Sequence, residues 1–387
     1  MKLRTITGRS TSTGQPLRIT VQQDRIQAIE PGPANETAWL SPGFIDLQIN
    51  GYCGCDFNLD LDDPDVVIAI AHKLIAIGTT TFIPTIITAS EDKIVRALDA
   101  IARARRASPL VAHAIPFVHL EGPFISPEEG AVGAHQREFV RPPSLDEFAR
   151  WQAACGDLVG TVTLSPHWEN SAEFIAALSA KGIRVSIGHT HATPEQIHAA
   201  AKAGATLSTH LGNGIAEMVP RHPNAIWAQL ADDRLTATFI ADGHHLPADT
   251  LKAMLRAKGI ERSILISDVV ALGGMPPGIY DEAVGGQVEL SADGRVGSLH
   301  SGFLAGSARP LKDGIAWITG ADVCGLGDAV KMATENPGRT LGHRGILRVG
   351  ETADIVRFTM DGKDKTMQIE TVLVEGAELA SQDRHAA

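Results

Sequence analysis

The stretch AIPFVHLEGP, residues 114–123, decides the fold, because an apolar run ends there in a carboxylate, Glu121. Four later stretches follow the same plan: RVSIGHT (184–190) ends at His189, TLSTHLGN (206–213) at His210, TATFIADGHH (236–245) at His244 and His245, and ILISDVV (264–270) at Asp268. In a barrel of parallel strands, the carboxyl ends of all strands converge on one face. Chain order therefore predicts one cavity lined by two carboxylates and several imidazoles, a set that can build a metal-assisted hydrolase.

From residue 43 onward, strand-like runs alternate with helix-like stretches. Eight runs follow one another, at 43–50, 78–86, 114–122, 160–166, 184–190, 206–213, 236–245 and 264–270. They are continuously apolar, as in strands buried on both faces. Eight βα units favour an α/β fold of the (β/α)8 TIM-type barrel over an open sheet, although the pattern alone fits both. Ser90, Ser144, Ser171 and Thr193 are expected to cap the helices that follow them.

The two ends of the chain break this rhythm. LRITVQQDRIQAIEPG (17–32) is strand-like near the start, and ADIVRFTM (353–360) and TMQIETVLVEGAEL (366–379) are strand-like near the end. We expect residues 1–42 and 345–387 to pair into one small β-sandwich domain. Residues 43–344 would then form the catalytic barrel.

Composition limits the partners and the location. The chain has 387 residues and a formal net charge of −11, and it contains no run of Lys or Arg, which argues against a nucleic-acid partner. The N-terminal stretch 1–14 has no apolar core, and the apolar stretch 79–89 contains Pro84 and is too short to span a bilayer. We therefore expect no membrane partner and a cytoplasmic location. An anionic substrate would need a local positive charge at its site, because the chain as a whole is negatively charged.

Three residues form a candidate set of metal ligands. Catalytic metal sites typically use three protein ligands and leave a position for water. Glu121, His189 and His210 come from three different strand ends, and Gly188 and Thr209 before the histidines leave room for an ion. A lone Glu is more often a buried ion pair, and a lone His a satisfied core histidine, but the three together favour ligands.

Asp268 is the candidate acid/base. A buried carboxylate without a partner is costly, and a water held at a metal would give it one, because the carboxylate can take the water's proton. The alternative is an aspartate that only bonds the barrel rim. One of His244 and His245 is expected to contact substrate and the other to belong to the rim. His135 and His167 are each either a solvated histidine or a substrate contact, whereas His191 and His198 are expected to be structural or exposed.

Several motifs resemble those of the N-acetylglucosamine-6-phosphate deacetylases, a family of the amidohydrolase superfamily. They extend over nearly the whole chain: PGFIDLQIN (42–50), HLEGPFIS (119–126), GAH (133–135), GHT (188–190), THLGNG (209–214), IADGHH (240–245), SD (267–268), LAGS (304–307) and ATENPG (333–338). The combination of HLEGPFIS and GAH is the most specific. The resemblance implies a (β/α)8 barrel, a β-sandwich built from both termini, and removal of acetate from a small amino-sugar phosphate.

The same resemblance implies roles residue by residue. It assigns Glu121, His189 and His210 to the metal and Asp268 to acid/base catalysis. It assigns the substrate contacts to His135, Asn213, Gly214, Arg221, His245 and Leu304. Arg221 matches a phosphate-binding arginine that the neighbouring subunit can supply in this family, which implies a homodimer.

The first predicted strand bears on the number of metal ions. Many amidohydrolases place His-x-His there as ligands of a second metal, whereas this chain has Gln48-Ile49-Asn50. Neutral amides are poor ligands for Zn²⁺ or Fe²⁺ beside such competitors. We therefore expect one divalent ion per subunit, with Zn²⁺ as the first choice and Fe²⁺, Co²⁺ or Mn²⁺ as alternatives.

Three segments depart from the family pattern: Gly212, Val269-Val270, and MVPRHPNAIW (218–227) around Arg221. They leave other N-acyl substrates open, namely N-acetylgalactosamine-6-phosphate, an unphosphorylated N-acetyl sugar or an N-acyl amino acid. A rival from another class is a non-catalytic sugar-phosphate-binding protein. The metal ligands and Asp268 argue against that rival, because binding alone does not need them.

Overall fold

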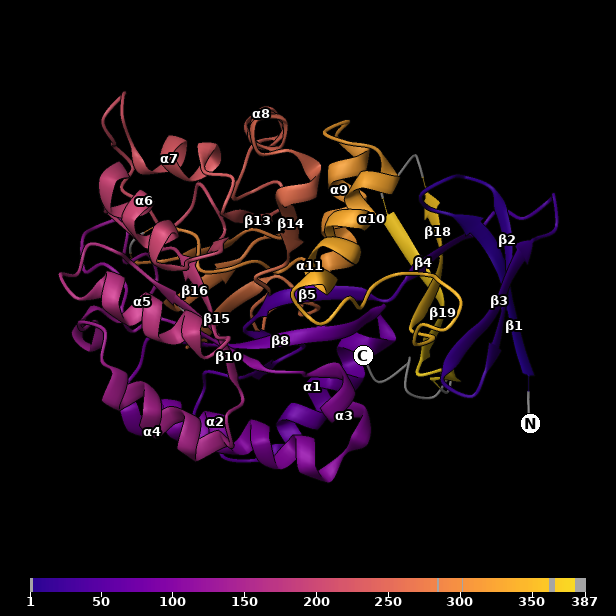
Figure 1. The fold of residues 1–387 in the computed structure, drawn as a ribbon, viewed down its shortest axis with the longest axis horizontal. Coiled ribbons are helices and arrows are strands. Elements are labelled where there is room, and N and C mark those ends of the chain that lie inside the picture. The colour runs from indigo at the N-terminus through magenta and orange to yellow at the C-terminus, as the bar shows by residue number, and fades with distance from the viewer. Residues whose placement is uncertain (1–2, 284, 301, 362–365, 380–387) are drawn as a thin grey trace.

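The computed structural model describes residues 3–283, 285–300, 302–361 and 366–379, and it consists of a barrel beside a separate sheet (Figure 1). Eight strands hydrogen-bond in chain order, each parallel to the next. They are β5 (Phe44–Ile49), β8 (Thr79–Ile87), β9 (Val118–Glu121), β10 (Val159–Leu164), β11 (Arg184–Ile187), β12 (Leu207–Ser208), β13 (Thr236–Ile240) and β14 (Ser263–Ile266). The predicted α/β barrel is confirmed.

The barrel closes between its first and last strands. Just past the end of β14, the backbone N–H of Asp268 donates to the carbonyl of Gln48 over 3.1 Å, and that of Asn50 donates to the carbonyl of Val269 over 2.8 Å. Closure at this point brings the ends of β5 and β14 together on the carboxyl face. Gln48 and Asn50, which precede every other motif in the chain, therefore lie beside Asp268.

Helices surround the barrel. The α-helices are α1 (Pro64–Ala76), α2 (Glu91–Ala107), α3 (Pro109–Ala114), α4 (Leu145–Cys155), α5 (Ser171–Ala180), α6 (Pro194–Ala203), α7 (Ala225–Ala231), α8 (Ala248–Lys258), α9 (Leu311–Gly320), α10 (Leu326–Met332) and α11 (Glu335–Arg339), with 3-10 turns at Arg137–Phe139 and Ile260–Arg262. Among the described residues, no helix is both long and apolar enough to cross a membrane.

Three of the four predicted helix caps are confirmed. Ser90 caps α2, Ser144 caps α4 and Thr193 caps α6, each accepting a backbone N–H with its hydroxyl. The prediction for Ser171 is wrong, because α5 starts one residue earlier than expected and Asn170 takes the cap position. Ser171 becomes the first helical residue, and its buried hydroxyl has no partner among the described residues.

An aromatic cluster fixes the loop that follows β9. Phe124 is fully buried, stacks on Trp151 of α4 with ring centroids 5.4 Å apart, and meets Phe174 of α5 edge-on at 5.2 Å. Such aromatic pairs add to the hydrophobic gain from burial. The chain is thereby anchored a few residues beyond Glu121, which holds that carboxylate in place.

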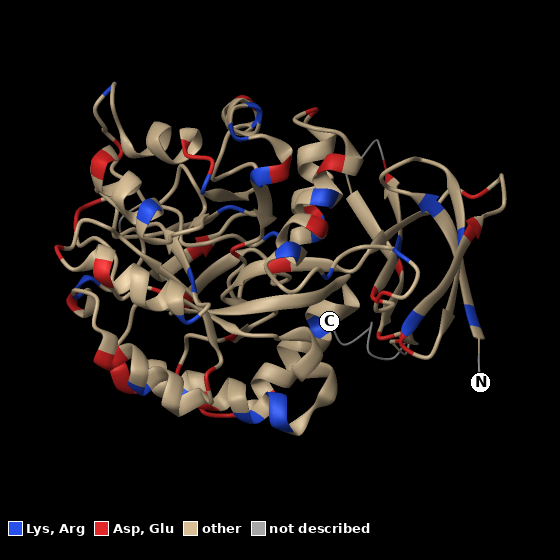
Figure 2. Cartoon of the chain, viewed as in Figure 1, with Lys and Arg blue, Asp and Glu red and all other residues tan. Residues whose placement is uncertain are grey.

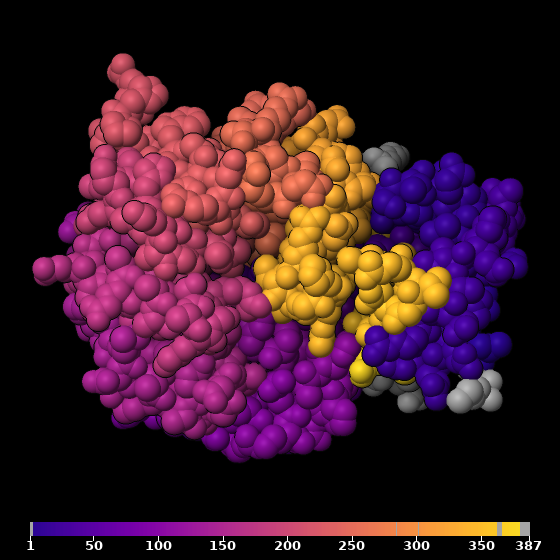
Figure 3. All heavy atoms as spheres, viewed as in Figure 1, coloured from indigo at the N-terminus to yellow at the C-terminus, as the bar shows by residue number. Residues whose placement is uncertain are grey.

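Both ends of the chain join in one sheet, as predicted. Its seven strands run in the order β20 (Ala377–Glu378), β19 (Thr366–Val374), β18 (Ile355–Asp361), β4 (Trp39–Pro42), β1 (Leu3–Ser10), β2 (Pro16–Gln22) and β3 (Arg25–Pro31). The junction is the antiparallel pair β4–β18, in which Ser41 lies opposite Val356. Figures 1 and 3 show the first and last strands side by side at one end of the molecule. The division at residues 42 and 345 stays a prediction.

A second small sheet was not predicted. Strands β15 (Gly278–Glu282), β16 (Gly286–Leu290) and β17 (Val296–Ser298) form an antiparallel unit between β14 and α9, and a hairpin of β6 (Gly51–Tyr52) and β7 (Cys55–Asp56) follows β5. The three-stranded unit has its own apolar cluster, which includes Val270, Leu272, Val288 and Val296.

Candidate metal centre and active site

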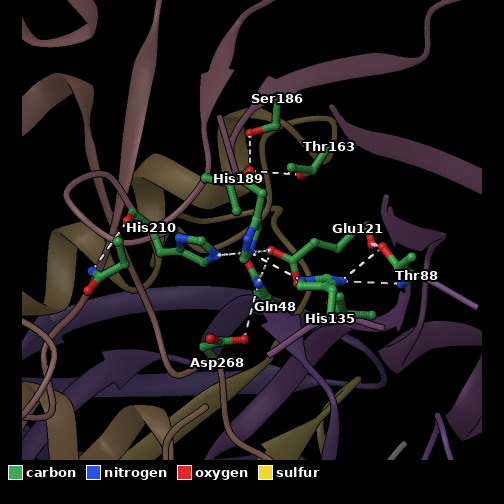
Figure 4. Close-up of polar contacts among 12 residues, drawn as sticks. Gln48, Thr88, Glu121, His135, Thr163, Ser186, His189, His210 and Asp268 are labelled. Atoms are coloured by element: carbon green, nitrogen blue, oxygen red, sulfur yellow. Dashed lines mark hydrogen bonds and ion pairs between the residues drawn. The ribbon is translucent and has the colours of Figure 1, made fainter. Parts of the chain in front are cut away.

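The three predicted ligands lie together at the carboxyl end of the barrel (Figure 4). Glu121 is the last residue of β9, and His189 and His210 each lie two residues beyond the end of a strand. All three side chains are buried. His189 and His210 have φ values of 47° and 26°, in the left-handed region that non-glycine residues rarely adopt. These turns aim both rings into the barrel, and backbone strain of this kind recurs at functional sites.

The distances within this group fit a shared cation. Glu121 Oε1 lies 3.0 Å from His210 Nε2 and 3.3 Å from His189 Nε2, and the two Nε2 atoms are 3.2 Å apart. Ligands placed tetrahedrally around Zn²⁺ would be roughly 3.3–3.5 Å apart. His189 Nδ1 lies 2.8 Å from the carbonyl oxygen of Ala131, so its proton is on Nδ1 and its Nε2 lone pair faces the group.

Electrostatics favour an anionic ligand at Glu121. Burial raises the pKa of this carboxyl group, but hydrogen bonds and charges from His189 and His210 outweigh burial and hold the pKa well below its ordinary value. Glu121 is therefore ionised at neutral pH. A buried carboxylate facing two imidazole nitrogens is a donor set suited to a divalent ion such as Zn²⁺.

Two amides connect this group to Asp268. Gln48 Nε2 donates to Glu121 Oε1 and to Asp268 Oδ1, at 3.0 Å in each case, and Asn50 Nδ2 donates to Asp268 Oδ1 at 2.8 Å. These amide nitrogens face carboxylates as donors and offer no lone pair to a cation. Burial, together with the charge of Glu121, raises the pKa of Asp268 to about 6. Asp268 also has a positive φ, 51°, immediately beyond its strand.

His135 lies against the centre. Its Nε2 is 3.3 Å from His189 Nε2 and 3.8 Å from Glu121 Oε2. Its Nδ1 accepts from the backbone N–H of Thr88 over 3.4 Å, which places the ring proton on Nε2. Burial lowers the pKa of His135 to about 3, so the ring is neutral. His135 therefore presents a hydrogen-bond donor beside the predicted ligands.

The two histidines in the turn after β13, His244 and His245, face different ways. His245 lines the cavity, and its Nδ1 lies 2.7 Å from Asp242 Oδ2. Asp242 Oδ1 accepts hydrogen bonds from the backbone N–H groups of His244, at 2.8 Å, and His245, at 2.9 Å. Burial raises the pKa of Asp242, but the hydrogen bond and charge of His245 outweigh burial and hold this pKa below its ordinary value. His244 instead contacts the carbonyl of Asp293 through Nε2 over 3.2 Å, at the rim.

These groups open into a cavity of about 360 Å³, within the size range of small-molecule sites. Its lining includes Asn213, Gly214 and Leu304 of the predicted substrate contacts. Arg221 is exposed and does not line the cavity of its own chain. The loop that carries it, before α7, projects from the surface (Figures 1 and 3).

The other histidines weighed in the sequence, His167, His191 and His198, lie outside the cavity lining. His167 Nδ1 bonds Ser165 Oγ at 2.7 Å, His191 Nδ1 bonds Ser126 Oγ at 2.5 Å, and His198 Nδ1 contacts Asp232 Oδ2 at 3.1 Å. Sequence reasoning assigned no role to His119, whose Nε2 bonds Thr163 Oγ1 at 2.7 Å inside the barrel. It also missed Glu217, Arg295 and Phe303, which line the cavity mouth. The Asp293-Gly294 pair before Arg295 is a turn signal that could have located the hairpin of β16 and β17.

The chain matches the model of the amidohydrolase family over residues 39–379. It is 35% identical to the N-acetylglucosamine-6-phosphate deacetylase of Bacillus subtilis (strain 168), covering 83% of this chain and 81% of that protein. It is 32% identical to the N-acetylgalactosamine-6-phosphate deacetylase of Escherichia coli O157:H7, covering 92% of each.

Solved structures agree with these sequence matches. N-acetyl-D-glucosamine-6-phosphate deacetylase from Mycobacterium smegmatis superposes with a TM-score of 0.86 at 29% identity, covering 98% of this chain and 100% of that chain. A second structure is a variant of that enzyme with an aspartate replaced by alanine, in complex with N-acetyl-D-glucosamine-6-phosphate. It superposes with a TM-score of 0.85 at 28% identity, covering 97% of this chain and 98% of that chain. The chain belongs to the amidohydrolase family, and within that family it is an N-acetylglucosamine-6-phosphate deacetylase-like enzyme.

Proposed function

We propose that this chain removes the acetyl group from N-acetylglucosamine-6-phosphate by hydrolysis. One observation carries the proposal: the amide of Gln48 donates both to Glu121 and to Asp268. It thereby links the group of Glu121, His189 and His210 to Asp268, and these four residues line one cavity. Similarity to the deacetylases over more than four fifths of the chain supports the same reaction.

Glu121, His189 and His210 would hold one divalent ion, with Zn²⁺ as the first choice. When bound, such an ion lowers the pKa of water and polarises a carbonyl group. The chain's own residues then orient the substrate and move protons. Asn50 and Gln48 hold Asp268 with one oxygen committed to amide donors, so the other oxygen is left to take a proton from the attacking water. Asp268 would return this proton to the amine as acetate leaves.

His245 is the proposed partner of the acetyl carbonyl oxygen. The Asp242 carboxylate, 2.7 Å from its Nδ1, orients the ring at the cavity wall, where a proton carried on Nε2 would be donated to the carbonyl oxygen. A donor aimed at an oxygen that gains negative charge lowers the barrier of acyl transfer. His135 Nε2–H, Asn213, Gly214 and Leu304 are the proposed contacts of the sugar.

Arg221 is proposed to bind phosphate in a neighbouring subunit. It is exposed on the projecting loop before α7, close to the exposed side chains of Met218 and Trp227. A second copy docked on this loop would bury these apolar groups and bring Arg221 to another cavity. The proposed assembly is therefore a homodimer.

N-acetylgalactosamine-6-phosphate is the second candidate substrate, because the Escherichia coli relative named for it matches 92% of the chain. The deciding experiment measures acetate release from both phosphorylated sugars and from unphosphorylated N-acetylglucosamine, with added Zn²⁺. We expect turnover of a phosphorylated sugar and at least tenfold lower kcat/KM for the neutral one. Turnover of the neutral sugar alone would refute phosphate recognition, and no acetate from any of the three would point to another N-acyl substrate.

A further inference from the structure

We propose that Arg295 binds the phosphate group of the substrate from within the subunit that also holds the catalytic centre. The inference rests on the proposed function, and it adds a specificity residue that the motifs did not indicate. Arg295 lies between β16 and β17 and lines the mouth of the cavity, together with Gly302 and Phe303.

The charge of the cavity makes this arginine distinctive. Within the described part of the chain, Arg295 is the one Lys or Arg that lines the cavity, whereas Glu121, Glu217 and Asp268 are carboxylates there. The whole chain has a net charge of −11, and Figure 2 shows Lys and Arg scattered among Asp and Glu along the ribbon. An anionic substrate therefore meets one guanidinium at the entrance.

The guanidinium is free to bind. Among the described residues, its side chain donates from Nη2 to the carbonyl of Gly302, at 3.0 Å, and no carboxylate pairs with it. Most of its N–H donors are therefore uncommitted. An arginine without a carboxylate partner can bind phosphate through two parallel hydrogen bonds, without first breaking an ion pair.

The backbone that carries Arg295 is firmly held. Ser291 N–H donates to the carbonyl of Arg295 over 2.9 Å, and Arg295 N–H donates to Ser291 Oγ over 3.1 Å. These bonds close a tight turn through Asp293 and Gly294, at the end of a sheet that packs beside the barrel. The exposed Arg295 side chain thus starts from a held backbone at the mouth, while the predicted metal ligands are buried deeper in the cavity. A sugar with its acetamide on the floor can extend its phosphate toward the mouth.

The test compares Arg295→Gln with wild type by calorimetric titration of glucosamine-6-phosphate and of unphosphorylated glucosamine. We expect the variant to bind the phosphorylated sugar about 10- to 100-fold more weakly, as for loss of a charge-assisted pair, and the neutral sugar within twofold of wild type. Arg295→Lys should recover part of the affinity, because it keeps the charge without the planar fork. Arg256→Gln, an exposed arginine of α8 outside the cavity, is the matched control.

Two results would overturn the proposal: equal loss of affinity for both sugars, which indicates a structural effect, or no loss for either. Inorganic phosphate, titrated and followed by ³¹P NMR, separates this inference from the proposed function. If wild type deacetylates a sugar phosphate while Arg295→Gln binds inorganic phosphate as wild type does, Arg295 has been misassigned and the function stands. The other outcome is that wild type deacetylates no sugar phosphate, while Arg295→Gln loses the binding of inorganic phosphate that wild type and Arg256→Gln retain. The anion site then stands, and the substrate is another anion.

Discussion

At the scale of single residues, Asp268 differs from the metal-site carboxylate in its partners. Glu121 faces two imidazoles, whereas the neutral amides of Gln48 and Asn50 donate to the Asp268 side chain. A carboxylate held by neutral donors stays available to exchange a proton, while one that faces imidazoles is better suited to hold a cation. Environment therefore separates the proposed roles of two identical functional groups.

This difference predicts the behaviour of Asp268→Asn. Asparagine keeps the size of the side chain but cannot accept the proton of the attacking water. We expect kcat to fall at least about 10³-fold, because general base catalysis is lost, with metal content unchanged. Steady-state kinetics and metal analysis by mass spectrometry measure both quantities. An Asp268→Asn enzyme with near wild-type kcat would rule out the proposed role.

Asp46 predicts a pH dependence of stability. It is fully buried, burial raises its pKa to about 7, and its Oδ2 has no partner among the described residues. The folded state keeps a proton that the unfolded chain releases near pH 4, so this group lowers stability progressively as the pH rises from about 4 to 7. Asp46→Asn retains the Oδ1 acceptor for two backbone N–H groups and removes the charge.

We therefore expect Asp46→Asn to be more stable than wild type at pH 8, by up to about 4 kcal/mol, with the gap narrowing toward pH 4.5. Urea unfolding across this range measures the difference. Asp281→Asn, at an exposed position of β15, should show no such trend. A gap that is constant with pH would mean that Asp46 does not change its protonation on folding.

The position of a residue could be predicted from the sequence where it follows a strand end, while its role stays a prediction. Glu121, His189, His210 and Asp268 follow apolar runs, and the structure brings all four to one cavity. Prediction fails where the contact depends on a loop. Arg295 sits on a hairpin whose place over the barrel depends on packing far along the chain.

At the scale of elements, the barrel strands were predictable because both of their faces are buried, which leaves an apolar run in the sequence. All nine residues of β8 are buried, for example. Strand β15 has no buried residue in its pattern, and β16 has two, so their composition carries no such signal. Composition therefore gave no prediction of this small sheet, although the Asp293-Gly294 pair marks the turn between β16 and β17.

One helix contact predicts a large effect on stability. Lys258, the last residue of α8, is buried, and its ammonium donates to the carbonyls of Gln229 and Asp232 at 2.8 Å and of Leu230 at 3.5 Å. These carbonyls lie at the end of α7, where a cation also complements the helix dipole. Burial lowers the pKa of Lys258 to about 8, which still leaves the group mostly charged at neutral pH.

We expect Lys258→Met to lower the free energy of unfolding by about 2–4 kcal/mol, because it leaves buried carbonyls without a donor. Chemical denaturation measures this loss. Lys252→Met on the same helix is the matched control, since Lys252 makes one bond, to the carbonyl of Asp322. Its effect should stay below about 1 kcal/mol. Equal effects of the two variants would show that the α7 contact adds no stability.

At the scale of the whole molecule, a metal at the proposed centre would tie three strands together. Glu121, His189 and His210 end β9 or follow β11 and β12, so an ion bound by all three stabilises the folded state over the unfolded chain. We expect chelation to lower the thermal midpoint by several degrees, with one equivalent of Zn²⁺ per chain restoring it. Calorimetry with a metal count measures both quantities. A midpoint unaffected by chelation, or two tightly bound ions per chain, would contradict this arrangement.

The shared sheet of the two termini has a consequence for synthesis. A ribosome delivers the N-terminal strands β1 to β4 first, but the partner that covers the edge of β4 is β18, which emerges after every barrel strand. Throughout elongation β4 therefore presents an unpaired edge, the kind of surface that recruits other chains. All eight barrel strands are synthesised before β18, whereas the edge of β4 is covered only after β18 has been made. A chain that stops short of β18 would leave the edge of β4 unpaired and prone to aggregate, and it would also lack Phe358, which packs against Phe44 of the barrel.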